Sequence, residues 1–397
     1  MRPTAQTALA LGFLLVTIAA AAPAQVPSLK NKLKEAAKKA ATKPADTTRT
    51  KVDSTPAAPA TAADGAAATA PASATVWENY DFVPGNQVLF YTDFSEDRVG
   101  NFARGLKYKS GPIEVVERDG AKVLRSTGRA EFLIPVGRIL PQRFTLEIDV
   151  IAPAGGAAGY DLVAIEGGRA LDRSEQSAEV NWNTPGTVII GGGHSASSNV
   201  KVPDAMEALL RGQPAHLRIL MDSAYFKMYV NERRMYNIPE LPFKRDSMVR
   251  VFVRGSEEPG MATYVTSVRL AESETDVLYD ALLAKGRWVT QGILFETGKS
   301  ELRPESRPVL KEIAATMQQH PDLDVLIEGH TDNVGSAASN LSLSEARARA
   351  VKAALVGEVG IGESRITTQG LGDTKPAVPN ATTAGRAQNR RVEVVKQ

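Results

Sequence analysis

The residue types best suited to chemistry lie in one block near the C-terminus, Ile327-Glu328-Gly329-His330-Thr331-Asp332-Asn333-Val334-Gly335. A second group, 340–348, follows closely and contains Arg347. Arg347 stands one helical turn before Val351 and two turns before Leu355, so all three would share one face of a helix. An arginine on an apolar face needs an anionic partner, because an unpaired buried charge is very costly. Its planar guanidinium suits a carboxylate.

Asp332 is the nearest candidate for that partner, because it lies in a loop that leaves a predicted strand. Binding groups are often carried on such loops. In a structural interpretation, Asp332 and Arg347 form an ion pair with each other. In a functional interpretation they stand apart and bind a zwitterion, with Arg347 on its carboxylate and Asp332 on its ammonium group. Physical reasoning alone favours the structural pair, since ion-pair networks are common.

His330 beside Asp332 could indicate a metal ligand or a general base. The four histidines stand at 194, 216, 320 and 330, and no two of them have the spacing of a metal site. The absence of cysteine also excludes disulfides and cysteine-based metal sites. We therefore predict a structural hydrogen-bonding role for His330, and neither a metal ion nor another cofactor.

The elements that must position this block alternate between strands and helices over residues 287–397. Pro304 and Pro308 fit the first turns of a helix, and Ser342 with Glu345 forms a capping-box pattern for a second one. The predicted order is β-α-β-α-β-β, which gives a small α/β sandwich. Its elements are a strand at 292–295, a helix at 304–319, a strand at 323–327, a helix from Ser342 to about Val356, and strands at 365–369 and 391–395.

The middle region, 77–271, is predicted to be all-β, because short apolar runs recur between turn signals. In Phe144 to Val150 every second residue is apolar, so one face should be core and the other wet. Asn231-Glu232 predicts a hairpin turn. The pattern favours a β-sandwich. Its runs are 132–134, 144–151, 162–165, 188–190, 217–221, 225–230, 249–253 and 264–270.

The remaining segments predict export and spacing. Residues 1–24 resemble a cleavable signal peptide, with Arg2, an apolar run and Ala22-Pro23-Ala24. Residues 25–76 are a basic, then Ala-, Thr- and Pro-rich linker, which should be a disordered spacer. Residues 272–286 should form a linker helix. We expect no transmembrane segment in the mature chain, and the net charge of +2 gives no case for nucleic acid.

The C-terminal motifs resemble the OmpA-like peptidoglycan-binding domain, a family that includes the peptidoglycan-associated lipoprotein and MotB. The resemblance rests on Glu328 to Asp332, on Arg347-Ala348, and on Asn389-Arg390-Arg391-Val392-Glu393. It implies that Asp332 and Arg347 bind the free amino-acid end of meso-diaminopimelate in the wall peptide. It further implies a groove bordered by Thr331, Asn340, Leu341, Phe295 and Arg390. Gly298 stands where many members of the family have asparagine.

The middle region resembles the concanavalin-like jelly-roll sandwich, some members of which are glycosidases with a Glu-x-Asp-x-x-Glu strand. Glu147 and Asp149 fit the first two positions, but Ala152 stands at the third. We therefore predict a non-catalytic protein of the periplasm, associated with cell wall and outer membrane in a Gram-negative bacterium, whose sandwich faces a carbohydrate or protein partner. The alternatives are a wall or glucan hydrolase tethered by the C-terminal domain, and an outer-membrane protein whose middle region crosses the membrane as strands.

Overall fold

A computed structural model describes ten stretches of the chain: 80–151, 153, 160–167, 179–184, 187–191, 200–201, 212–241, 243, 245–273 and 278–397. The predicted signal peptide and spacer lie outside the described residues, as does Ala152. Among the helices described, none is both long and apolar enough to cross a membrane.

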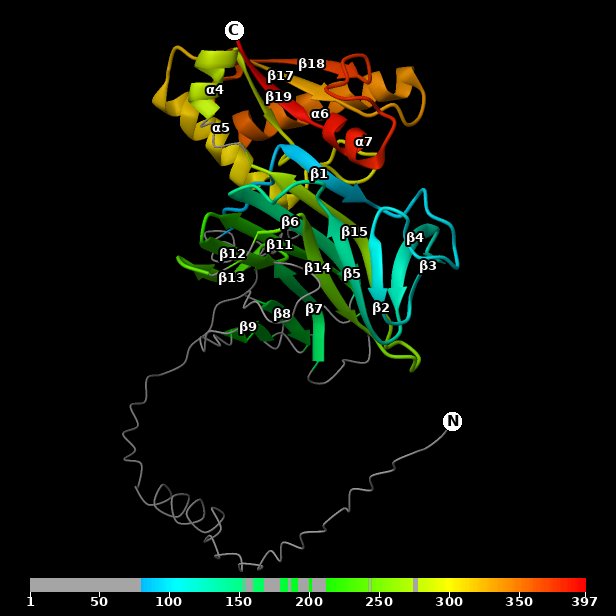
Figure 1. The fold of residues 1–397 in the computed structure, drawn as a ribbon. Coiled ribbons are helices and arrows are strands. Elements are labelled where there is room, and N and C mark those ends of the chain that lie inside the picture. The colour runs from blue at the N-terminus through cyan, green and yellow to red at the C-terminus, as the bar shows by residue number, and fades with distance from the viewer. Residues whose placement is uncertain are drawn as a thin grey trace, which may run out of the picture. The chain divides into compact units, whose positions relative to one another are not determined.

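The middle region forms two antiparallel sheets (Figure 1). The eight-stranded sheet has the order β13-β12-β11-β6-β15-β4-β3, with β1 also paired to β15. Its strands are β1 (Gln87–Thr92), β3 (Ile113–Arg118), β4 (Ala121–Ser126), β6 (Arg143–Ile151), β11 (Pro214–Asp222), β12 (Tyr225–Val230), β13 (Arg233–Ile238) and β15 (Thr263–Glu272). The seven-stranded sheet runs β10-β9-β8-β7-β14-β5-β2. Its strands are β2 (Lys107–Ser110), β5 (Arg129–Pro135), β7 (Tyr160–Gly167), β8 (Glu179–Thr184), β9 (Thr187–Gly191), β10 (Val200–Lys201) and β14 (Met248–Arg254).

One hydrophobic core joins the two sheets. Ile148 and Leu217 of the eight-stranded sheet are buried in the same cluster as Phe132 and Val251 of the other sheet. The sheets therefore face each other across this core, and each apolar run predicted from the sequence lies within a strand. Asn231 adopts a φ of 50° in the two-residue turn between β12 and β13, as the hairpin prediction required.

The second face of β6 departs from the prediction. Its alternation is as expected, because Phe144, Leu146 and Ile148 all lie in the core. The opposite face was predicted to be wet, yet Glu147 is also buried. Alternation identifies which residues share a face, but it does not show whether another part of the chain covers the polar face.

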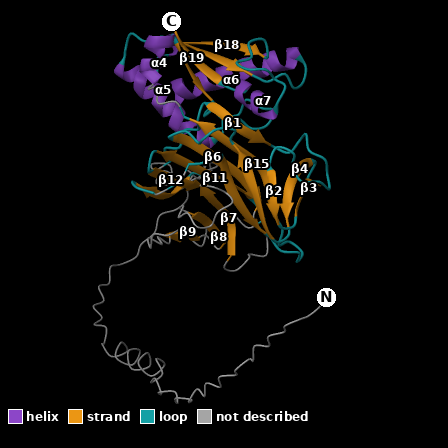
Figure 2. Ribbon diagram, viewed as in Figure 1, coloured by secondary structure: helices purple, strands orange, loops and turns teal. Residues whose placement is uncertain are grey.

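The C-terminal region forms a four-stranded sheet in the order β16-β19-β17-β18, with helices packed on it (Figure 2). β17 and β18 are parallel, and the other two pairs are antiparallel. The elements are α4 (Leu278–Lys285), β16 (Arg287–Thr290), a 3-10 turn (Pro304–Ser306), α5 (Arg307–Gln319), β17 (Val325–His330), α6 (Ala337–Gly357), a second 3-10 turn (Glu363–Arg365), β18 (Ile366–Gly372), α7 (Thr383–Asn389) and β19 (Val392–Lys396).

Three local predictions for this region were wrong. The opening strand is 287–290 rather than 292–295. Helix α6 begins before Ser342, because Ser336 is its N-cap and accepts a hydrogen bond from the Ser339 amide at 3.2 Å. A short helix, α7, separates the last two strands, so the predicted β-α-β-α-β-β order lacked one helix. Its N-cap is Thr382, whose hydroxyl accepts from the Gly385 amide at 3.0 Å.

Candidate ligand-binding groove

Close packing of α6 on β17 sets the frame of the candidate site. A Cβ on Gly329 would come within 2.4 Å of the Ser344 carbonyl oxygen, so only glycine lets the helix lie this close to the strand. The approach places the loop after β17, which carries Asp332, beside the helix that carries Arg347. Both side chains line a cavity of about 670 Å³, which we call the groove.

Asp332 is buried in the groove with 7% of its surface exposed. Its Oδ2 accepts a hydrogen bond from Nη1 of Arg390 at 2.6 Å, and its Oδ1 accepts one from the Val334 amide at 3.0 Å. The ion-pair partner of Asp332 is therefore Arg390, and not Arg347 as the structural interpretation of the sequence would require.

Among the described residues, no carboxylate forms an ion pair with Arg347. Its Nε donates to the Lys299 carbonyl at 3.0 Å, and its guanidinium lies 4.8 Å from the centre of the Phe295 ring. Burial, followed by the charge of Arg390, lowers the pKa of Arg347, while Asp332 opposes this effect. An arginine in such surroundings favours an added anion.

The other predicted groove residues fall into two groups. Thr331 and Asn340 line the groove and also fix its loop: the Thr331 hydroxyl and the Asn340 amide both donate to the Asp332 carbonyl, at 2.9 and 3.1 Å. Leu341 is 43% exposed and is not among the lining residues, whereas Leu343 is. Gly298 lines the groove with a φ of +70°.

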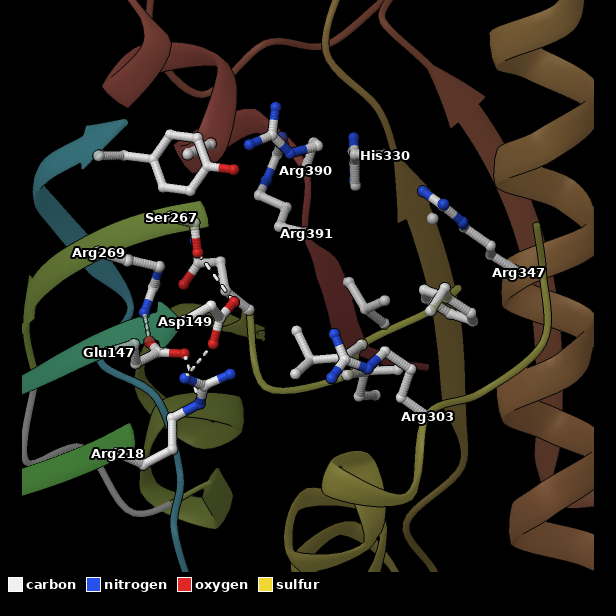
Figure 3. Close-up of a pocket in the computed structure, with 18 residues that line it drawn as sticks. Glu147, Asp149, Arg218, Ser267, Arg269, Arg303, His330, Arg347, Arg390 and Arg391 are labelled. Atoms are coloured by element: carbon white, nitrogen blue, oxygen red, sulfur yellow. Dashed lines mark hydrogen bonds and ion pairs between the residues drawn. The ribbon is translucent and has the colours of Figure 1, made fainter. Parts of the chain in front are cut away.

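The last strand was predicted to begin at residue 391, one residue before its observed start. Strand β19 begins only at Val392, and Arg390 and Arg391 both line a second cavity of about 230 Å³ (Figure 3). Arg390 binds Asp332, while Arg391 donates to Glu393 at 2.7 Å.

His330 is buried beside two carboxylates. Its Nε2 lies 3.6 Å from Glu393 and 3.9 Å from Glu328, and neither ring nitrogen has a hydrogen-bond partner among the described residues. The predicted side-chain hydrogen bond is therefore not found there. These three groups could surround a metal ion, but Arg287 and Arg391 already pair with Glu393. Burial, with the Arg391 charge next, lowers the pKa of His330 to about 4, so the ring is neutral at pH 7.

The two sandwich carboxylates suggested by the glycosidase motif are fixed by cations. Arg269 donates to Glu147, and Arg218 donates to Asp149 at 2.6 Å (Figure 3). Asp149 also accepts from Ser267 and contacts His216, each at 2.8 Å. Burial alone would raise the pKa of Asp149, but Arg218 and His216 outweigh it and hold the pKa far below its usual range. Asp149 therefore carries no proton to donate at neutral pH.

Sandwich residues also line the groove, although the sequence did not predict this. The described residues belong to one compact unit, and strand β1 lies beside α7 (Figure 1). Nothing in the local sequence links these positions to the distant C-terminal motifs, because none of them is part of a recognisable pattern. The residues are Tyr91, Asp93, Ser95 and Glu96.

The fold and the groove define a small α/β domain that presents a polar, arginine-rich cavity at the end of a β-strand. The model of the OmpA family matches residues 294–390. Residues 294–390 are thus an OmpA family domain, which confirms the resemblance drawn from the motifs.

Known proteins match this chain over a limited length. Outer membrane porin F of Pseudomonas aeruginosa is 44% identical over 101 residues, which are 25% of this chain and 29% of that protein. Outer membrane protein A of Bordetella avium is 46% identical over 101 residues, 25% of this chain and 51% of that protein. The solved peptidoglycan-associated lipoprotein from Burkholderia pseudomallei is 32% identical, with a TM-score of 0.26, and the match covers 31% of this chain and 100% of that one. The chain thus spans under a third of porin F and about half of the Bordetella protein.

Proposed function

We propose that this protein is a non-catalytic anchor that binds peptidoglycan through the groove of its OmpA family domain. In this proposal Arg347 binds the free carboxylate of a diaminopimelate end, and Asp332 binds its ammonium group. A carboxylate has about four acceptor positions, so Asp332 can accept a further donor beside Arg390 and Val334. The observation that carries the proposal is that Asp332 and Arg347 line one cavity without pairing with each other.

The names of similar proteins support the wall and the outer membrane as the setting. Two relatives are named as outer membrane proteins, and one solved structure is named as a peptidoglycan-associated lipoprotein. We infer a periplasmic location at the cell wall and outer membrane, with residues 1–24 as the export signal.

We further propose that the sandwich, 77–271, is a jelly-roll module that the anchor holds at the wall, where it contacts a carbohydrate or protein partner. A tethered glycosidase is disfavoured, because such an enzyme needs a carboxylic acid that can give up a proton. Arg218 and Arg269 hold Glu147 and Asp149 in ion pairs instead.

Co-sedimentation of the full chain with purified sacculi tests the anchor. The wild type should sediment with sacculi, and Arg347→Ala should remain largely in the supernatant. A matched control is Arg349→Ala, two residues further along α6, where the arginine is exposed and pairs with Glu345. Equal sedimentation of wild type and Arg347→Ala, or equal loss in both variants, would contradict the proposal.

A further inference from the structure

The groove has two walls, and the sandwich supplies one of them. The lining residues from the OmpA family domain include Asp332, Arg347 and Arg390. The facing residues come from the end of β1 and the turn after it. They are Tyr91, Asp93, Ser95 and Glu96.

Hydrogen bonds between β1 and α7 hold this wall in place. The Gln388 side chain accepts from the Val88 amide and donates to the Asn86 carbonyl, each at 2.6 Å. The Thr383 hydroxyl donates to the Tyr91 carbonyl at 3.0 Å. The Tyr91 ring also lies 5.1 Å from the guanidinium of Arg390. The wall is therefore fixed to α7, which carries Arg386 and ends directly before Arg390.

Not every charged side chain that lines the groove forms an ion pair with another lining residue. Its three acids and three arginines form two ion pairs, Glu96 with Arg386 and Asp332 with Arg390. The acid and the arginine that remain are Asp93 and Arg347. They belong to opposite walls, one to the sandwich and the other to the OmpA family domain.

One carboxylate oxygen of Asp93 can accept a hydrogen bond from a ligand. Its Oδ1 accepts from the amide and the hydroxyl of Ser95, at 3.1 and 2.6 Å, while its Oδ2 has no hydrogen bond within the described part of the chain. Lys122, which lines an adjoining cavity with Asp93, donates instead to the Ser95 and Asp97 carbonyls. An unpaired acid and an unpaired arginine in one cavity complement a ligand that carries both charges.

We infer that the sandwich completes the ligand site, with Asp93 as a second carboxylate that binds, together with Asp332, the ammonium group of the ligand held by Arg347. The inference rests on the proposed function and narrows it. The ligand must present a free carboxylate and a free ammonium group together, as an uncrosslinked diaminopimelate end does. An end whose amine has been converted to an amide in a crosslink would lose the bond to Asp93.

Calorimetric titration of the full chain with meso-diaminopimelate and with pimelate tests the inference. Pimelate keeps both carboxylates and lacks both ammonium groups. Asp93→Asn should weaken diaminopimelate binding by about ten-fold or more, the loss of one charge-assisted bond, and should not weaken pimelate binding. Asp93→Glu, which keeps the carboxylate, should recover part of the affinity. Asp322→Asn, an exposed acid that does not line the groove, is the matched control.

The outcomes separate this inference from the proposed function. Asp93→Asn that binds diaminopimelate as tightly as the wild type overturns the inference and leaves the anchor standing. Tighter binding by Asp93→Asn also overturns it, because the sandwich would then obstruct the groove. A wild-type chain that binds neither diaminopimelate nor sacculi overturns both. A thermal melt of each variant confirms that it is folded during the titration.

Discussion

Physical reasoning from the sequence favoured an ion pair between Arg347 and Asp332, but each of these residues contacts other groups. Asp332 is paired with Arg390, and Arg347 is held by a backbone carbonyl and an aromatic ring. Both residues line one cavity, and their binding of a ligand stays a prediction. Which arginine would bind Asp332 could not be predicted, because Arg390 reaches it from the end of a short helix that was not predicted from the sequence.

The ion pair between Asp332 and Arg390 should contribute to the stability of the fold. A double-mutant cycle of Asp332→Asn with Arg390→Gln should give a coupling free energy of about 1 kcal/mol, since the pair is partly exposed on the arginine side. The cycle of Asp332→Asn with Arg347→Gln should give a coupling near zero. Urea denaturation measures both. A larger coupling with Arg347 would contradict the observed pairing.

His330 predicts a pH dependence of stability. Its pKa is about 4 in the fold and about 6.5 in the unfolded chain, so the unfolded chain binds the proton more tightly. Above pH 6.5 the neutral His330 ring makes its full contribution to the free energy of unfolding. This contribution is lost as the pH falls toward 4, by on the order of 2–3 kcal/mol. Burial alone would raise the pKa of Glu393, but the neighbouring Arg391 outweighs burial and lowers it.

Denaturation of wild type and His330→Asn between pH 7 and 4.5 measures this effect. The free energy of unfolding should fall more steeply in the wild type than in the variant. Comparing the slopes removes any constant cost of the substitution itself. Parallel curves would show that His330 does not titrate differently in the folded and unfolded states.

At the scale of elements, α4 behaves as part of the C-terminal core. It lies in the segment predicted as a linker helix, yet Leu278, Ala281 and Leu282 are buried in the cluster that includes Ile313 and Val351. Apolar spacing predicts a helix and its buried face, but it does not identify the surface that the face covers. For the same reason, the Ser342 capping-box pattern could not reveal that α6 had already begun at Ala337.

Two adjacent leucines of α4 provide a matched test. Leu282 is 1% exposed and Leu283 is 54% exposed. Leu282→Ala should destabilise the protein by about 2–5 kcal/mol through lost burial and a cavity, while Leu283→Ala should change stability by about 0.5 kcal/mol or less. Thermal melts of the full chain compare them. Similar small effects in both variants would show that α4 is only a connector.

At the scale of the whole molecule, two regions with separate cores meet at a polar face. The buried charges of β6 and the arginines of the OmpA family domain line the same cavity (Figure 3). The sequence predicted a β-rich sandwich region and an OmpA family domain, because periodicity and motifs are local properties. Their meeting could not be predicted, because the residues that form it are ordinary polar residues far apart in the chain.

The central claim is that the groove binds the zwitterionic end of a wall peptide through Arg347. Titration of the full chain with free meso-diaminopimelate tests it most directly, with Arg347→Ala and Arg347→Lys measured beside the wild type. The account predicts saturable binding by the wild type and a loss of roughly ten- to a hundred-fold in Arg347→Ala. A substantial loss in Arg347→Lys is also expected, because lysine keeps the charge without the planar fork. Undiminished binding by folded Arg347→Ala would contradict the account.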